Sequence, residues 1–336
     1  MEMMRKERID RGVRVRTAGL YAISTWREML YLVGPPLFLI LGMIILPIIL
    51  EFAPYWKRVI NIVCVYTLLA LAFDFLANFV GLVCLGGAFF VGVGGYLSAI
   101  FNVYLHFPVY LSIPLATICG AVISTLLLMP ALPLRGVYFA IVTLMYPLLA
   151  TRVIEALNIF GGTNGIIGLD SLPNEYVEHY LIIIATLIFL YGLRRFVNQD
   201  MGLVIRGVKD NDQAVRASGI SVTRMKAFAV FVASFMGCFA GAYISHMYSW
   251  AGTSLFALDF SIIPIASVVI GGGGTLLGAV VGSFILVPVS ELLRNFGTFR
   301  IVIYCVILTG FIVFKSEGIL VYAMRKYHQF ERWVKV

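Results

Sequence analysis

The residue with the clearest chemical potential in this sequence is an aspartate inside an apolar run. Asp74 lies within "YTLLALAFDFLANFV", residues 66–80, and an ionisable side chain inside a membrane-length run is a candidate functional site. Its carboxylate can contact an amine, relay a proton or pair with a neighbouring helix, and the sequence leaves these roles open. Arg152 and Glu155 lie three residues apart and are expected to satisfy one another on one helix face.

Motifs for catalysis are absent from the sequence. It contains no Gly-x-x-x-x-Gly-Lys-Ser/Thr nucleotide loop and no nucleophile–base motif. Its five cysteines each lie alone in an apolar run, without the Cys-x-x-Cys or Cys/His spacing of a metal site. We therefore expect no cofactor, no metal ion and no enzymatic activity from this chain itself.

Two glycine-rich stretches interrupt the apolar runs, "GLVCLGGAFFVGVGG" (81–95) and "VIGGGGTLLGAVVGS" (269–283). Irregular backbone is tolerated at membrane depth only beside protein or a water-filled cavity, and broken helices often line the solute path of transporters. For isolated glycines, close approach of two helices is the favoured explanation. The four consecutive glycines at 271–274 strip side chains from more than one face, which favours a break in the helix.

A polar, charge-mixed stretch, "GLVIRGVKDNDQAVRASGISVTRMKAF" (202–228), separates two apolar segments. Asp200 predicts the cap of a helix over 201–209, "DND" (210–212) breaks that helix, and Gly219 ends a second one over about 212–218. A helix of seven residues spans about 10 Å and is marginal alone in water, so it needs a partner surface. The second helix carries a stripe of small residues with charged flanks: Ala214, Val215, Ala217 and Ser218, flanked by Asp212 and Arg216.

The composition is that of a polytopic membrane protein. The 336 residues have a mean hydropathy of +0.96, and 12% of them are charged, against about 25% in soluble domains. The net charge of +8 reflects basic clusters that flank apolar segments: seven Lys and Arg within 1–30, seven within 194–226 and five within 315–336. This distribution follows the positive-inside bias, so we expect no nucleic-acid binding.

Apolar runs near the length of a membrane span are predicted at 32–50, 58–78, 88–105, 109–129, 137–159, 179–193 and 226–248. A run over 259–293 and a last segment at 299–314 follow. If 259–293 breaks at its glycines into a half-helix and a full helix, both basic termini lie in the cytoplasm. The prediction is an all-α polytopic membrane protein with about ten transmembrane segments, including broken helices.

The chain divides into a basic cytoplasmic N-terminal segment (1–31), one transmembrane domain (32–315) and a basic cytoplasmic tail (316–336). The transmembrane domain includes the charged cytoplasmic loop at 194–225. Residues 13–31 mix basic and aromatic side chains, and they form either an interfacial helix on the cytoplasmic surface or a disordered lead-in.

Four stretches occur in a recognisable order: "ALAFDFLANFVGLVCLGGAFFVGVGGYLSA", "LRGVYFAIVTL" with "GGTNGIIGL", the charged stretch, and "VVIGGGGTLLGAVVGS". With the closing "FKSEGIL", they resemble the M-type permease subunits of branched-chain amino-acid ABC importers over roughly residues 60–320. The resemblance implies the ABC importer permease fold, the bacterial inner membrane, and docking of the charged stretch on a cytoplasmic ATPase. It also implies two ATPase subunits, a second related permease and a periplasmic solute-binding protein, with import driven by ATP hydrolysis on the partner subunits.

The same resemblance assigns candidate residues to two roles. The ATPase-coupling residues are Arg206, Lys209, Asp210, Asn211, Asp212, Ala214, Val215, Arg216, Ser218 and Gly219. The residues of the solute path are Asp74, Asn78, Gly86, Gly87, Thr163, Asn164, Gly271, Gly272, Gly273 and Gly274.

Three positions depart from the family pattern, which usually has Asn at 74, Ser at 84 and a polar residue at 87, where this chain has Asp74, Cys84 and Gly87. The solute is therefore a branched-chain or related amino acid or, alternatively, urea, a short amide or an aromatic compound. Two readings of another class remain: a proton-coupled secondary transporter that uses Asp74, and a channel or scaffold with the glycine run at its pore. Neither needs the docking stretch at 200–224.

Overall fold

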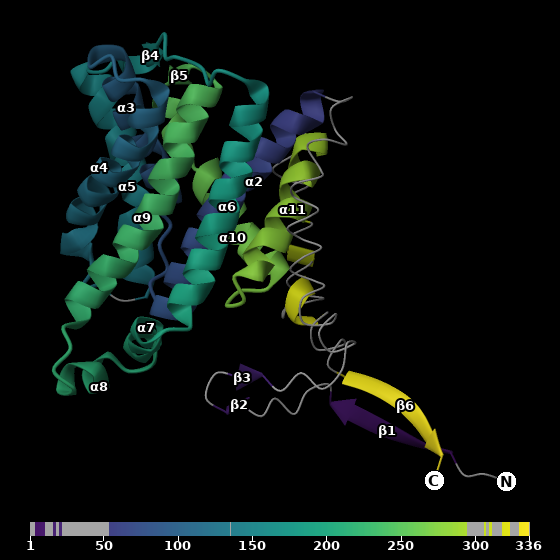
Figure 1. Cartoon of the computed structure of the whole chain (residues 1–336). Coiled ribbons are helices and arrows are strands. Elements are labelled where there is room, and N and C mark those ends of the chain that lie inside the picture. Colours follow the sequence, from purple (N-terminus) through teal and green to yellow (C-terminus); the bar gives the residue numbers. More distant parts are fainter. Residues whose placement is uncertain are drawn as a thin grey trace.

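The computed structural model describes residues 4–10, 16–17, 20–21, 54–134, 136–293, 306, 309–310, 318–322 and 329–335. Helices make up most of them (Figure 1). The α-helices are α2 (Pro54–Asp74), α3 (Gly87–Ala99), α4 (Val109–Leu128), α5 (Val137–Leu157), α6 (Glu175–Val197), α7 (Asp200–Asp210), α8 (Asp212–Ala217), α9 (Val222–Met247), α10 (Asp259–Gly271) and α11 (Leu277–Leu292). Two π-helices, η2 (Phe75–Val80) and η3 (Ile100–Tyr104), continue α2 and α3, and the 3₁₀ turns are η4 (Met129–Ala131), η5 (Gly162–Asn164) and η6 (Thr253–Phe256).

Within the described residues, seven helices are long and apolar enough to cross a membrane. They are Tyr55–Val80, Gly87–Tyr104, Val109–Ala131, Val137–Leu157, Glu175–Val197, Val222–Met247 and Thr253–Gly271, and a shorter apolar helix follows at Leu277–Leu292. The predicted all-α membrane fold is thus confirmed. The predicted segment at 32–50 and most of that at 299–314 lie outside the described residues, so the number ten stays a prediction.

The helices cross the molecule in alternating directions and leave two distinct ends (Figure 1). At one end lie α7 and α8. At the other lie β4 (Ile166–Ile167) and β5 (Trp250–Ala251), which pair antiparallel. We call these the α7–α8 end and the β4–β5 end.

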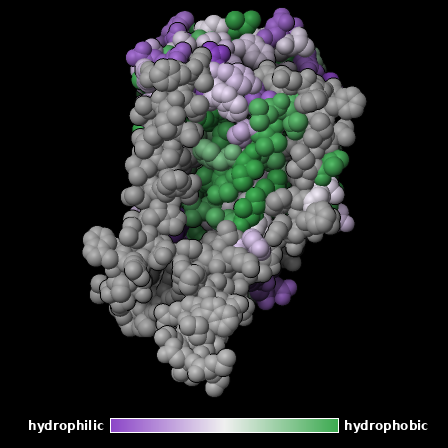
Figure 2. Space-filling model, turned by 90° about the vertical axis from the view of Figure 1, so that its right-hand side faces the viewer, coloured by the Kyte–Doolittle hydropathy of each residue, from purple (hydrophilic) through white to green (hydrophobic). Residues whose placement is uncertain are grey.

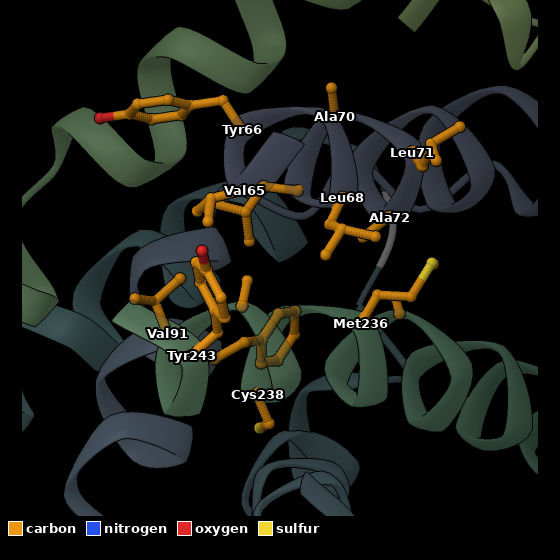
Figure 3. Close-up of a cluster of buried hydrophobic side chains, with 14 of the residues drawn as sticks. Val65, Tyr66, Leu68, Ala70, Leu71, Ala72, Val91, Met236, Cys238 and Tyr243 are labelled. Carbon is orange, nitrogen blue, oxygen red and sulfur yellow. The ribbon is translucent and has the colours of Figure 1, made fainter. Parts of the chain in front are cut away.

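The core is built around α2, which contacts α6, α9, α10 and α11. Val65 and Leu68 of α2 meet Met236 and Tyr243 of α9, and all four side chains are almost fully buried (Figure 3). A helix that is apolar on every side belongs in such an interior. Because lipid is as apolar as these side chains, close packing rather than water exclusion stabilises the contact.

The outer helices expose large apolar side chains, as a lipid-facing surface requires. Leu126 of α4, Leu149 of α5 and Ile188 of α6 are each more than 60% exposed. On the side of α2 and α11, hydrophilic residues gather at the β4–β5 end, and a hydrophobic surface lies below them (Figure 2). This banding is the pattern of a protein that sits in a bilayer.

Helices α3 and α9 approach closely because glycines line their contact. A Cβ at Gly94 of α3 would overlap the backbone of Cys238, and a Cβ at Gly241 of α9 would overlap the backbone of Val91. Small residues allow such backbone-to-backbone packing between membrane helices. Glycine at these positions therefore allows α3 and α9 to pack backbone against backbone.

We expect Gly241→Leu to reduce the folded yield severely, because the side chain has no room against Val91 and overpacking costs about 1–3 kcal/mol or more. The control is Gly192→Leu on α6, where nothing in the described part of the chain lies within 4 Å of an added Cβ. Size-exclusion chromatography of detergent extracts measures both. Equal yields for the two variants would contradict the close contact of α3 and α9.

The two ends of the chain meet in a short ribbon. Strand β1 (Met4–Asp10) pairs antiparallel with β6 (Gln329–Lys335), and β2 (Arg16–Thr17) pairs with β3 (Leu20–Tyr21). The interfacial helix that is one alternative for 13–31 is thus wrong at 16–17 and 20–21, because these residues form a pair of strands. The other residues of that span lie outside the described ones.

Candidate functional site

The charged stretch folds into two short helices, α7 and α8, which match the predicted ranges closely. Asp200 is the first residue of α7 rather than its cap, a position held by Gln199; an acidic residue in the first turn still favours the helix dipole. The side-chain oxygen of Asn211 accepts hydrogen bonds from the backbone N–H groups of Gln213 (3.1 Å) and Ala214 (3.2 Å). This is an N-terminal cap for α8, and Gly219, with φ +80°, follows its end.

Helix α7 is held by the bundle, whereas α8 presents its surface. Ile205 and Val208 of α7 are buried. None of the six residues of α8, all within the described part, is buried. Ala214, Ala217 and Ser218 are exposed. Val215 is half-buried, and its Cγ2 lies 3.2 Å from the position that a Cβ on Gly207 of α7 would take.

A charged pair flanks this small-residue face. Arg216 and Asp212 approach to 3.9 Å on neighbouring turns of α8, and the arginine side chain is 61% exposed. The Asp212 side chain is only 12% exposed, so the two partners differ: the carboxylate lies against the protein, and the guanidinium reaches the surface beside the small-residue face.

Two of the predicted coupling residues turn toward the bundle. The guanidinium of Arg206 lies 5.4 Å from the ring centroid of Phe79, and the ammonium of Lys209 donates a hydrogen bond to the Asn78 carbonyl (2.8 Å). Phe79 and Asn78 both belong to η2. The structure thus gives these cations an internal role, joining α7 to the end of the α2 span.

A cavity of about 360 Å³ opens between α7–α8 and the ends of the spans. Lys209, Asp210, Asn211 and Asp212 line one side of it, and Lys226 of α9, which is 9% exposed, lines another. Sequence reasoning missed Lys226 as a site residue. The available signal was its place near the start of an apolar span, where a buried cation needs polar surroundings.

The run at 259–293 breaks at its glycines, as predicted, into α10 and α11. The predicted order of a half-helix and then a full helix is wrong, because the helix before the glycines, Thr253–Gly271, is long enough to span a membrane and Leu277–Leu292 is the shorter one. The two helices pack against one another: a Cβ at Gly271 would overlap the carbonyl of Gly278, and one at Gly282 would overlap that of Ser267. The turn between them uses φ +106° at Gly272 and +81° at Gly274, values that favour glycine. We call residues 271–276 the glycine turn.

Gly318 lies against the glycine turn, which the sequence analysis did not foresee. A Cβ on this residue would overlap the α-carbon of Gly272, so its segment contacts the turn directly. The signal was present in the "FKSEGIL" motif, but nothing in the sequence connects that motif to the glycines more than forty residues before it.

Asp74 is fully buried and binds the backbone of the glycine turn. Its Oδ1 accepts from the Gly274 N–H (2.7 Å) and from Nδ2 of Asn78 (2.6 Å), and its Oδ2 accepts from the Leu276 N–H (3.0 Å). A carboxylate is costly to bury unless such donors surround it. The structure thus brings together Asp74, Asn78, Gly273 and Gly274 at the α7–α8 half of the molecule.

The break at 81–86 has side-chain caps that the sequence did not reveal. Thr143 Oγ1 accepts from the Leu85 N–H (3.0 Å), and Ser261 Oγ accepts from the Ala88 N–H (3.0 Å). The predicted path residues Gly86 and Gly87 therefore lie against α5 and α10, where an added Cβ would come within 3.1 Å of the Thr143 carbonyl and 2.9 Å of the Phe260 carbonyl, respectively.

Thr163 and Asn164 lie elsewhere, on η5 at the β4–β5 end (Figure 1). Both are exposed, and the Asn164 carbonyl accepts a hydrogen bond from Nε1 of Trp250 (2.9 Å). The predicted path residues thus form groups at opposite ends of the spans rather than one cluster. A shared path would have to run along the helices between them.

Other polar residues of the spans satisfy one another. Arg152 and Glu155 form the predicted pair at 3.1 Å. His246 is buried at the β4–β5 end, where Nε2 hydrogen-bonds Ser98 (2.9 Å) and Nδ1 donates to the Asp170 carbonyl (2.7 Å). These groups position the loop of η5 and β4 on α3 and α9.

Comparison with known proteins identifies the family of this chain. Residues 55–314 match the model of the branched-chain amino acid transport system / permease component family. The chain is 25% identical over 287 residues to the high-affinity branched-chain amino acid transport system permease protein LivM of Salmonella typhimurium, covering 76% of this chain and 68% of that protein. It is 27% identical over 224 residues to the probable branched-chain amino acid transport permease protein LivM of Methanocaldococcus jannaschii, covering 62% and 65%.

No solved structure matches the chain. The family match spans the described bundle from α2 onward, and it includes the glycine turn, the break at 81–86 and both helices of the charged stretch. The protein therefore belongs to the family of permease components of branched-chain amino acid transport systems.

Proposed function

We propose that this chain is the membrane-spanning permease subunit of an ATP-driven ABC importer that carries branched-chain or related amino acids across the bacterial inner membrane. The observation that carries the proposal is α8, a capped helix of six residues with no buried residue among them. So short a helix is marginal by itself, and its small-residue face leaves room for another protein to approach closely. The names of the relatives support the class of solute.

The proposed complex contains two cytoplasmic ATPase subunits that receive α8, a second related permease, and a periplasmic solute-binding protein. The α7–α8 end then faces the cytoplasm and the β4–β5 end faces the periplasm. The basic clusters near the termini and in the charged loop support this orientation, and the β1–β6 pairing supports termini on one side. ATP hydrolysis belongs to the partner subunits, and lipid surrounds α4, α5 and α6.

The hydrogen bonds of Asp74 weigh against a proton-coupled secondary transporter. Both carboxylate oxygens are engaged by backbone amides of the glycine turn, so the group serves a turn of the chain rather than a water-filled path. Urea, short amides and aromatic compounds remain the alternative solutes within the same importer class.

The proposal is tested on the complex purified from the native host in mild detergent. We expect mass spectrometry to identify two ATPase subunits and a second permease in the preparation. In proteoliposomes supplied with the cognate binding protein, radiolabelled leucine should enter only with ATP, and isoleucine and valine should compete. Competition by urea, acetamide or phenylalanine instead would replace the amino-acid assignment with one of the alternatives. Uptake driven by a pH gradient without ATP would overturn the importer.

A further inference from the structure

The glycine turn is anchored by Asp74, a buried side chain of α2. Asp74 binds the N–H groups of Gly274 and Leu276, the residues that lead into α11. Leu276 has φ +56°, a conformation that costs about 1 kcal/mol or more for a residue other than glycine. The hydrogen bond to the carboxylate helps to hold this backbone in place, so the position of the turn depends on the position of Asp74.

The π-helix η2, which follows Asp74 and carries Asn78, is also bound by α7. The Asn78 side chain donates to Asp74 (2.6 Å), while the Asn78 carbonyl accepts from Lys209 (2.8 Å). That carbonyl is among the last four of η2, which lack partners within the helix, and a cation is favourable at such an end. The aliphatic stem of Lys209 also packs over Gly81, which has φ +80°. The Lys209 Cγ lies 3.0 Å from the position that a Cβ on Gly81 would take.

A continuous chain of short polar contacts therefore leads from α7 to the glycine turn. It runs from the Lys209 ammonium to the Asn78 carbonyl, then from the Asn78 side chain to Asp74, and from Asp74 to the amides of Gly274 and Leu276. Each of its hydrogen bonds involves a charged group, Lys209 or Asp74, and is the stronger for it. The side-chain nitrogen Nδ2 of Asn78 lies 2.6 Å from the position that a Cβ on Gly273 would take. The turn and η2 therefore have little freedom to move separately.

We infer that Lys209 and Asp74 are positioning residues that connect α7 to the glycine turn, so that a displacement of α7–α8 moves the turn between α10 and α11. This inference rests on the proposed function, in which an ATPase displaces α8. It gives Lys209 a role distinct from contact with the ATPase, and it gives Asp74 a role distinct from contact with the solute. Both side chains act through the backbone that they hold.

The first test measures the connection without any solute. In the purified complex, Lys209→Met keeps the aliphatic stem over Gly81 and removes the ammonium. We expect hydrogen–deuterium exchange of the amides in 271–277 to become about tenfold faster, since loss of a hydrogen bond to a charged group changes an equilibrium constant by about that factor or more. Lys209 bonds Asn78 and not these amides, so the effect would have to pass through Asn78 and Asp74. Lys209→Arg should restore slow exchange. The control is Arg194→Met, which removes an exposed cation near the same end. Unchanged exchange in Lys209→Met would overturn the inference.

The second test measures the coupling of ATP hydrolysis to import in proteoliposomes. We expect Lys209→Met and Asp74→Ala, which removes both acceptor oxygens, each to lower the leucine imported per ATP hydrolysed about tenfold while hydrolysis continues. The double variant should be no worse than the more impaired single variant, because both break one connection. Effects that multiply would overturn the inference. Absence of ATP-driven uptake by the unmodified complex would instead contradict the proposed importer, and the exchange experiment would still decide the connection.

Discussion

Ala214→Glu is expected to abolish ATP-driven uptake while leaving the permease folded in the membrane. The residue is exposed on the small-residue face of α8, and a charge buried unpaired in an interface costs several kcal/mol, about two orders of magnitude or more in affinity. The substitution does not threaten α8 itself. Position 214 is the third residue after the Asn211 cap, where glutamate is favourable to a helix N-terminus. Leucine uptake and co-purification of the ATPase subunits measure the effect.

Two further variants show whether the loss arises at the face of α8. Ala214→Ser keeps the side chain small and should retain most uptake. Gln199→Glu adds the same charge at the same end of the molecule, but on the link before α7, where it is exposed; its uptake should also persist. If Ala214→Glu transported leucine as well as these two variants do, α8 would not be the surface that receives the ATPase.

Gly271→Ala is expected to remove most uptake and to lower the yield of folded protein, although it adds only one methyl group. That methyl group would overlap the carbonyl of Gly278 on α11, and both partners are backbone atoms that no side-chain rotation can relieve. Overpacking of this kind costs about 1–3 kcal/mol or more, and separating α10 from α11 would also displace the amides bound by Asp74. Folded yield and ATP-driven uptake are measured side by side.

The matched control lies three residues along the same glycine turn. Gly274→Asn adds a larger side chain at a position with φ +81°, which asparagine adopts more readily than most residues. Among the residues that the structure describes, its Cβ would meet only Asn78, at an ordinary 3.8 Å. We expect this variant to fold and to transport better than Gly271→Ala. The reverse order would mean that the glycines provide a flexible surface turn rather than a close contact between two helices.

The sequence predicted helices α7 and α8 well because their signals are local. Asn211 caps α8 and Gly219 ends it through hydrogen bonds and backbone angles that span only a few residues. The exposure of Ala214 follows from the same short helix. Asp200 was misplaced by one position, a typical uncertainty at helix ends.

The roles of single side chains were less accessible. Nothing around Lys209 distinguishes a lysine that faces an ATPase from one that binds Asn78, because the distinction depends on η2, which lies 131 residues away in the sequence. Asp74 and the glycine turn are separated by 200 residues. Thr163 and Asn164 belong to a family motif, but only the bundle shows that they lie at the opposite end from the glycine turn.

By itself, the sequence determined that this protein spans a membrane many times, where most of its spans begin and end, where a span breaks at glycines, and which stretch folds into the helices α7 and α8. These features depend on hydropathy, glycine content and capping over windows of at most some twenty residues. Only the tertiary structure decided which face of α7 is buried, that the Asp74 carboxylate holds the glycine turn, and that Gly318 closes over it. These contacts join segments remote in sequence, and packing geometry rather than local preference selects them.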